Sequence, residues 1–105
     1  MARKSLDFDP KFRDIILQGK KIATIRKGRK KFIEGEIVNI TFGGKKCCKA
    51  RILRVRYMKY GELNEGDAIA DGFKSLRELQ RELEKFYGEL KKDDVITQIV
   101  FEIIK

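Results

Sequence analysis

The segment that decides the fold of this 105-residue chain reads Gly19-Lys20-Lys21-Ile22-Ala23-Thr24-Ile25-Arg26-Lys27-Gly28. Residues 22–26 are rich in β-branched side chains, which predicts a strand. The dipeptide Lys27-Gly28 then predicts a turn. A helix is expected immediately before the segment, because Asp9 can cap it, Pro10 suits its first position and Gly19 can end it.

The same segment carries an amine, a hydroxyl and a guanidinium, at Lys21, Thr24 and Arg26. The sequence has no carboxylate between Asp14 and Glu34. Such a cationic stretch attracts anions. The segment therefore predicts a site for an anion or a polar ligand.

Hydrophobic periodicity predicts the remaining elements. A short first strand is expected around Leu6 and Phe8. Further strands are expected at residues 37–42, 48–57 and 95–104, and helices at residues 63–70 and 76–87. Strands interrupted by helices without regular alternation predict an α+β fold, a small mixed β-barrel with helices packed around it.

Two details of the core follow from the same patterns. In strand 48–57, a bulge at Leu53 is expected to leave Ala50, Ile52, Val55 and Tyr57 facing inward. In helix 76–87, the leucines and Phe86 share one stripe, which predicts core. Ser75 and Glu78 predict a capping box at the start of that helix.

Length and composition favour a single domain over residues 1–105, without disulfides or metals to stabilise it. No apolar run reaches the ~18 residues of a membrane span, and the start Met-Ala-Arg-Lys-Ser lacks the apolar core of a signal peptide. We therefore expect a cytoplasmic protein with no membrane partner.

The chain has no histidine and only two cysteines, the adjacent Cys47 and Cys48. Two thiols cannot complete a four-ligand zinc site, and neighbouring strand residues point to opposite faces, so neither a metal nor a disulfide is expected. No cofactor is expected either. Any acid-base chemistry must use Lys, Asp, Glu, Tyr or Cys.

Charge divides unevenly along the chain. Residues 1–61 hold 18 Lys and Arg against 5 Asp and Glu, whereas residues 62–105 hold 7 against 11. The basic half is suited to phosphates, which favours RNA or a nucleotide as partner. The alternative is that these cations form only a solvated surface.

Four blocks of sequence resemble the ASCH domain family, in the order of that family. They are Gly19-Lys20-Lys21-Ile22-Ala23-Thr24-Ile25-Arg26, residues 32–38, residues 65–73, and the closing Ile99-Val100-Phe101-Glu102. The resemblance implies a PUA-like pseudobarrel, a fold shared with RNA-modification domains, with a cleft near the first block.

One branch of the family that this chain resembles hydrolyses the acetyl amide of N4-acetylcytidine. Its proposed catalytic Lys and Thr fall on Lys21 and Thr24, and its acid falls on Asp71, where the family usually has Glu. Other branches are thought only to bind RNA. The resemblance therefore implies either catalysis or binding at these residues.

The residues themselves allow the chemistry that the resemblance implies. A threonine hydroxyl needs a base, and an amine of lowered pKa can serve, so Lys21 is the candidate. Its neighbours Lys20 and Arg26 should lower the pKa of Lys21. In a straight strand Lys21 and Thr24 would point to opposite faces, so their pairing requires a bend at Lys21-Ile22. Arg26 shares a face with Thr24, although it could instead pair with Asp71.

Three functions remain open from the sequence. As a binding module, the domain would hold RNA or a modified nucleoside through a set of cations: Lys20, Lys21, Arg26, Lys27, Arg29, Lys30 and Lys31. As an amidohydrolase, it would act through Thr24, with Lys21 as base and Asp71 orienting it or donating a proton. As a structural or protein-interaction domain, it would use its acidic C-terminal half.

Overall fold

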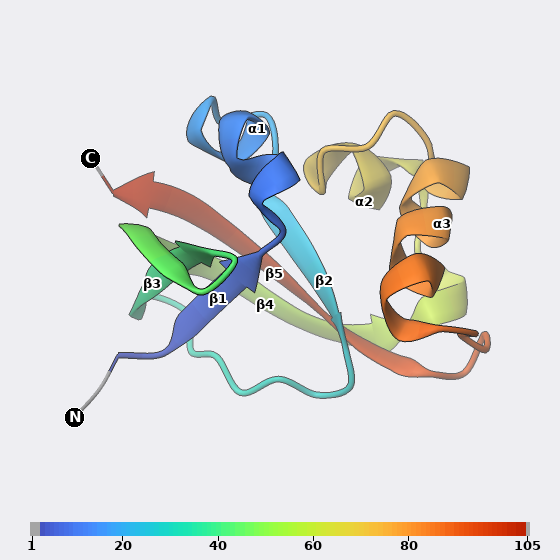
Figure 1. Ribbon diagram of the computed structural model, residues 1–105. Coiled ribbons are helices and arrows are strands. Elements are labelled where there is room, and N and C mark those ends of the chain that lie inside the picture. The colour runs from blue at the N-terminus through green and yellow to red at the C-terminus, as the bar shows by residue number, and fades with distance from the viewer. Residues whose placement is uncertain (1–2, 105) are drawn as a thin grey trace.

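The computed structural model describes residues 3–104, which form one curled five-stranded sheet with helices around it (Figure 1). The strands are β1 (Ser5–Phe8), β2 (Ala23–Lys27), β3 (Ile37–Phe42), β4 (Lys45–Lys59) and β5 (Val95–Ile104). Their order across the sheet is β1-β3-β4-β5-β2. The pair β1/β3 is parallel and the other pairs are antiparallel. The predicted α+β barrel-like architecture is confirmed.

The helices lie in two groups on either side of β2 (Figure 1). The short helices η1 (Pro10–Phe12) and α1 (Arg13–Leu17) connect β1 to β2. The connection from β4 to β5 contains η2 (Tyr60–Glu62), α2 (Glu65–Ala70) and α3 (Leu76–Tyr87). Asp9 caps η1 as predicted, because its carboxylate accepts a hydrogen bond of 2.9 Å from the backbone N–H of Lys11. None of the helices within residues 3–104 is long and apolar enough to cross a membrane.

The capping box lies one helix earlier than the sequence predicted. Ser75 accepts from the backbone of Glu78 at 3.2 Å, which is half of a box. Both halves are present at α2, where Asn64 and Asp67 bond each other's backbone N–H groups at 2.9 and 3.0 Å. The sequence pattern did not reveal this box because Asn and Asp take the places of the usual Ser and Glu.

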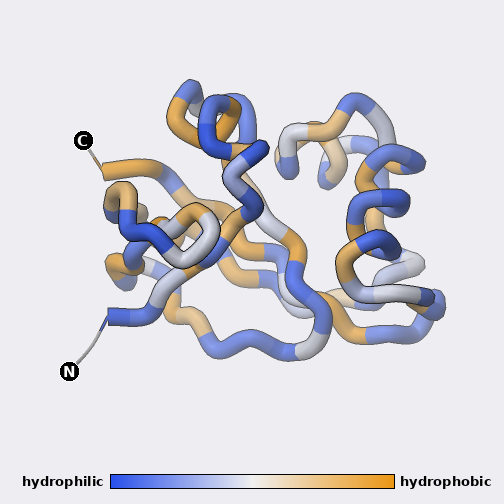
Figure 2. The backbone as a smooth tube through the Cα atoms, in the orientation of Figure 1, coloured by the Kyte–Doolittle hydropathy of each residue, from blue (hydrophilic) through white to orange (hydrophobic). Residues whose placement is uncertain are grey.

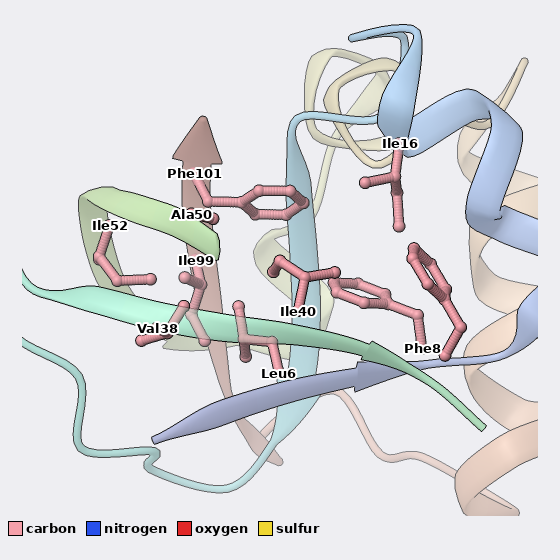
Figure 3. Packing of buried hydrophobic residues seen from close by; sticks show 10 residues of the cluster. Leu6, Phe8, Ile16, Val38, Ile40, Ala50, Ile52, Ile99 and Phe101 are labelled. Atoms are coloured by element: carbon pink, nitrogen blue, oxygen red, sulfur yellow. The ribbon is translucent and has the colours of Figure 1, made fainter. Parts of the chain in front are cut away.

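Two clusters of buried side chains hold the fold together. The first fills the concave side of the sheet with residues that include Leu6, Phe8, Ile40 and Phe101, and α1 closes it with Ile16 (Figure 3). The second joins β2 and β5 to α2 and α3 through side chains such as Ile25, Ile96 and Leu79. Arg26 thus lies on β2 and Lys21 on the turn before it, and the two clusters pack on opposite sides of this segment.

The bulge predicted at Leu53 is confirmed by a shift of register between Ile52 and Arg54. The inward orientation of Tyr57 is wrong, because its side chain is 42% exposed. Tyr57 instead packs on the β2–β3 loop, where its hydroxyl donates to the carbonyl oxygen of Lys30 at 2.9 Å. The loop, and not the core, covers the sheet at this end.

Phe86 is also exposed, although the sequence predicted a core position for it. Its side chain is 78% exposed, whereas Leu79 and Leu83 of the same helix are buried. In the last turn of α3 the next residue, Tyr87, packs against the second cluster in its place. Both positions follow Leu83 at helical spacing, so periodicity could not decide between them.

The sheet does not close into a full barrel, because β1 and β2 are its two edges. A side chain spans the seam between them: one terminal N–H of Arg26 on β2 donates to the carbonyl oxygen of Asp7 on β1 at 2.8 Å. Side chains rather than a strand ladder therefore connect these edges. This seam positions the candidate site.

Candidate functional site

A cavity of about 110 Å³ lies at the seam between β1 and β2 and is also lined by α3. We call it the seam cavity. Lys21, Thr24, Arg26 and Asp71 all line it. Much of the remaining wall is aromatic and consists of Phe8, Phe12, Phe73, Phe86 and Tyr87. The structure thus brings together the four residues that the sequence singled out, Asp71 from one segment and the other three from another.

Lys21 and Asp71 form a buried ion pair in this cavity. The Lys21 ammonium contacts the carboxylate of Asp71 and donates a second hydrogen bond of 2.8 Å to its backbone carbonyl. The two side chains are each only 4% exposed. Asp71 reaches the amine although it is one methylene shorter than the usual Glu. The suggested pairing of Arg26 with Asp71 is wrong, because Lys21 takes that carboxylate.

The backbone on both sides of Lys21 explains its orientation. Lys21 precedes β2, and its backbone N–H donates to the carbonyl of Ile15 at 3.0 Å, while the next N–H, of Ile22, donates to Ala70 at 2.9 Å. The required departure from a straight strand at Lys21-Ile22 is therefore present. It lets Lys21 and Thr24 line one cavity.

Three phenylalanine rings surround the Lys21 amine, at 5.8 Å (Phe8), 5.0 Å (Phe12) and 5.6 Å (Phe73) from Nζ to the ring centre. Such rings attract a cation but provide little solvation. Burial lowers the pKa of Lys21 to about 7, with Arg26 acting in the same direction and Glu82 in the opposite one. The sequence predicted the contribution of Arg26 but not burial, which is the larger cause.

Arg26 holds Thr24 in place. Its Nε–H donates to the Thr24 hydroxyl at 3.0 Å, and its guanidinium lies 4.9 Å from the centre of the Phe8 ring. The carboxylate of Asp7 accepts from Thr41 at 2.6 Å and from Gly44 at 2.8 Å, both at Oδ1, and its charge also acts on Arg26. These two bonds lower the pKa of Asp7. Arg26 thus keeps further N–H donors for a ligand.

The rim of the cavity joins η1 to α3. Lys11 and Glu82 form an ion pair there, with 2.6 Å between Nζ and the nearer carboxylate oxygen. Phe86 and Tyr87 follow on α3, with their ring centres 4.9 Å apart and their planes nearly perpendicular. The sequence did not indicate these rim residues or the phenylalanine wall, because no local spacing shows that the two helical regions meet.

The other predicted ligand-binding cations lie on the surface outside the seam cavity. Lys20 is exposed on the turn before β2. Lys27, Arg29, Lys30 and Lys31, which we call the cationic segment, are exposed at the end of β2 and in the following loop, whose first residues are hydrophilic (Figure 2). Arg29 stacks on Tyr57, with 4.4 Å between its guanidinium and the ring centre. Within residues 3–104 no group of three acidic or cysteine side chains could hold a metal ion.

Comparisons with known proteins agree with this architecture. The sequence profile of the ASCH domain matches residues 4–105. An ASCH domain from Lactobacillus crispatus JV V101 superposes with a TM-score of 0.80 at 21% identity, over 95% of this chain and 79% of that one. A protein from Enterococcus faecalis V583 gives 0.73 at 17% identity, over 99% and 82% of the two chains.

A variant of an ASCH protein from Zymomonas mobilis gives a TM-score of 0.64 at 14% identity, over 96% of this chain and 71% of that one. Identities this low establish a shared fold and no more. No curated protein matches the sequence. The fold is therefore the PUA-like half-barrel that the resemblance implied.

Proposed function

The chain belongs to the ASCH domain family, and we propose that its seam cavity binds one nucleobase of a modified nucleoside, either free or within RNA. The observation that carries this proposal is the convergence of Thr24, Arg26 and the Lys21–Asp71 pair on a cavity with aromatic walls. A base has apolar faces and a polar edge, so it matches aromatic walls with a few convergent polar groups.

The size of the cavity limits the ligand. A dry cavity of roughly 150 Å³ is known to hold one benzene molecule, and the seam cavity has about 110 Å³. It therefore cannot hold two rings, and at most one ring of the ligand lies inside it. Arg26 would donate to a carbonyl of that ring or of its substituent, since the guanidinium already lies against the wall.

Replacing Arg26 by alanine should weaken binding of cytidine and of N4-acetylcytidine at least about tenfold, because the charge-assisted hydrogen bonds to the ligand are removed. Isothermal titration calorimetry measures this effect. The matched control is Arg81→Ala, which removes an exposed guanidinium from α3 and should change nothing. Equal affinity of Arg26→Ala and wild type would contradict the proposed site.

A second candidate function is hydrolysis of the acetyl amide of N4-acetylcytidine. The observation that favours it is an amine of pKa about 7 in the same cavity as a threonine hydroxyl. Neutral Lys21 would accept the proton of Thr24 as its oxygen bonds to the acetyl carbon. The resulting ammonium, held by Asp71, would return that proton to the departing amine of cytidine, and water would then release acetate from Thr24.

RNA binding, if the base is presented in a strand, should depend on the cationic segment. Changing Lys27, Arg29, Lys30 and Lys31 together to serine should weaken binding of all single-stranded sequences alike. It should also flatten the salt dependence, by about 0.7 in the log-log slope for each phosphate that the variant no longer neutralises. Fluorescence anisotropy from low to high salt measures both.

The matched control for this variant changes four exposed cations elsewhere, namely Arg77, Arg81, Lys91 and Lys92, to serine. Both variants lower the net charge equally. An identical weakening in the two would mean that only net charge matters, and the cationic segment would be rejected as the binding surface. No binding of RNA or nucleoside by wild type would leave the protein-interaction function.

A further inference from the structure

Phe86 has no role in the core and none in the chemistry described above. Among residues 3–104 it is the most exposed of the large hydrophobic side chains. Single exposed apolar residues are common on protein surfaces, and Ile33 and Ile69 are examples here, at 68% and 61% exposure. Phe86 differs from these two because its side chain also lines the seam cavity.

Phe86 lies at the rim of the cavity, where a ring of the ligand that does not fit inside would lie. Only one ring fits inside, so a second ring attached to the ligand must lie at the rim. There the ring of Phe86 is fixed edge-on by Tyr87. An aromatic side chain that is held on one side and open on the other is a typical stacking surface for a base.

Charges of both signs lie at this rim, where a ligand with two rings would place the phosphate between them. The carboxylate of Glu82, one helical turn before Phe86, is paired with Lys11, and the carboxylate of Asp7 is bonded to Thr41 and Gly44. The cationic segment begins at Lys27, directly after Arg26, which lines the cavity together with Phe86. A phosphodiester leaving the cavity thus meets the paired Glu82, the ionised Asp7 and the Arg26 guanidinium.

We infer that Phe86 stacks the base adjacent to the one in the seam cavity, so that the preferred ligand is a single-stranded RNA step of two nucleotides rather than a free nucleoside. This inference rests on the proposed function and identifies its ligand class. Phe86 is then a specificity-determining residue. It selects for a second ring, whereas Arg26 and Thr24 contact the first.

The test distinguishes the contribution of the second base to the affinity from that of the phosphate that links the two nucleotides. The ligands titrated by calorimetry are cytidine, the dinucleotide CpC, and two versions of CpC with one base removed, from the 5′ nucleotide or from the 3′ nucleotide. Wild type should bind CpC about five- to a hundredfold more tightly than at least one abasic ligand, as expected for one stacked base.

Phe86→Ala should abolish this preference, and it should lower the affinity for CpC more than the affinity for cytidine. Because Phe86 is exposed, the variant should fold, and circular dichroism can verify this. Phe86→Leu keeps an apolar side chain without a ring and should also lose the preference. Ile69→Ala, which removes an exposed apolar side chain from α2 outside the cavity, should retain it.

Equal binding of CpC and both abasic ligands by wild type would overturn the inference, as would a preference that survives in Phe86→Ala. An equal loss of cytidine and CpC affinity in Phe86→Ala would limit Phe86 to its place in the cavity wall and would also overturn the inference. In each of these cases the proposed function stands as long as wild type binds cytidine. Failure of wild type to bind any of the ligands would refute both.

Discussion

Thr24→Ala should abolish release of acetate from N4-acetylcytidine, and Lys21→Ala should slow it at least about a hundredfold, the contribution of a general base. In wild type, kcat/KM should rise with pH through about 7, where Lys21 loses its proton. Chromatographic detection of cytidine measures all three results. The matched control is Thr24→Ser, which keeps the hydroxyl and should retain activity.

Thr24→Ala should also have a small structural effect. Thr24 is buried and accepts from Arg26, so its removal should lower the free energy of unfolding by about 1 kcal/mol. A wild-type protein that binds N4-acetylcytidine without releasing acetate would reject hydrolysis and leave binding as the function.

Lys21→Met should lower the free energy of unfolding by about 3–5 kcal/mol, because it leaves the buried carboxylate of Asp71 without its partner. The double change Lys21→Met with Asp71→Val should restore stability to the wild-type value or above it, since apolar residues of similar volume often replace buried ion pairs without loss. Urea denaturation at one pH below about 7, where Lys21 carries its charge, measures both. An equal loss in the single and double variants would contradict this account.

The matched control is the exposed pair Arg51–Glu102, with 3.7 Å between its charged atoms. Arg51→Met should change stability by less than about 1 kcal/mol. The pH dependence gives an independent check. The pKa of Lys21 falls from 10.5 to about 7 on folding, so between these values the unfolded chain binds more protons. Wild type should therefore gain stability relative to the double variant as pH rises through this window.

Local pattern was sufficient to predict the strands and to single out Lys21, Thr24 and Arg26 of the seam cavity, whereas Asp71 came from the family resemblance. The β-branched run before Arg26 became β2, and the bulge at Leu53 lies where the alternation breaks. Arg26 and Thr24 were expected on one face because strand residues two apart share a face, and their hydrogen bond of 3.0 Å agrees.

The packing of distant segments against one another could not be predicted in the same way. The burial of Lys21 depends on Phe12 and Phe73, which come from two different helical regions. The exposure of Tyr57 and Phe86 depends on what covers them, a loop in one case and no element in the other. Periodicity assigns a residue to a face of its own element, but it does not say whether another element covers that face.

The open seam between β1 and β2 has a consequence for the order of folding. Backbone ladders link these edges through β3, β4 and β5, and β2 pairs with β5, which begins at Val95. Pairings of such long sequence separation form late and slowly. A nascent or partly folded chain therefore cannot assemble the seam cavity, and ligand at a hundred times its Kd would stabilise only the completed fold, by about 2.7 kcal/mol.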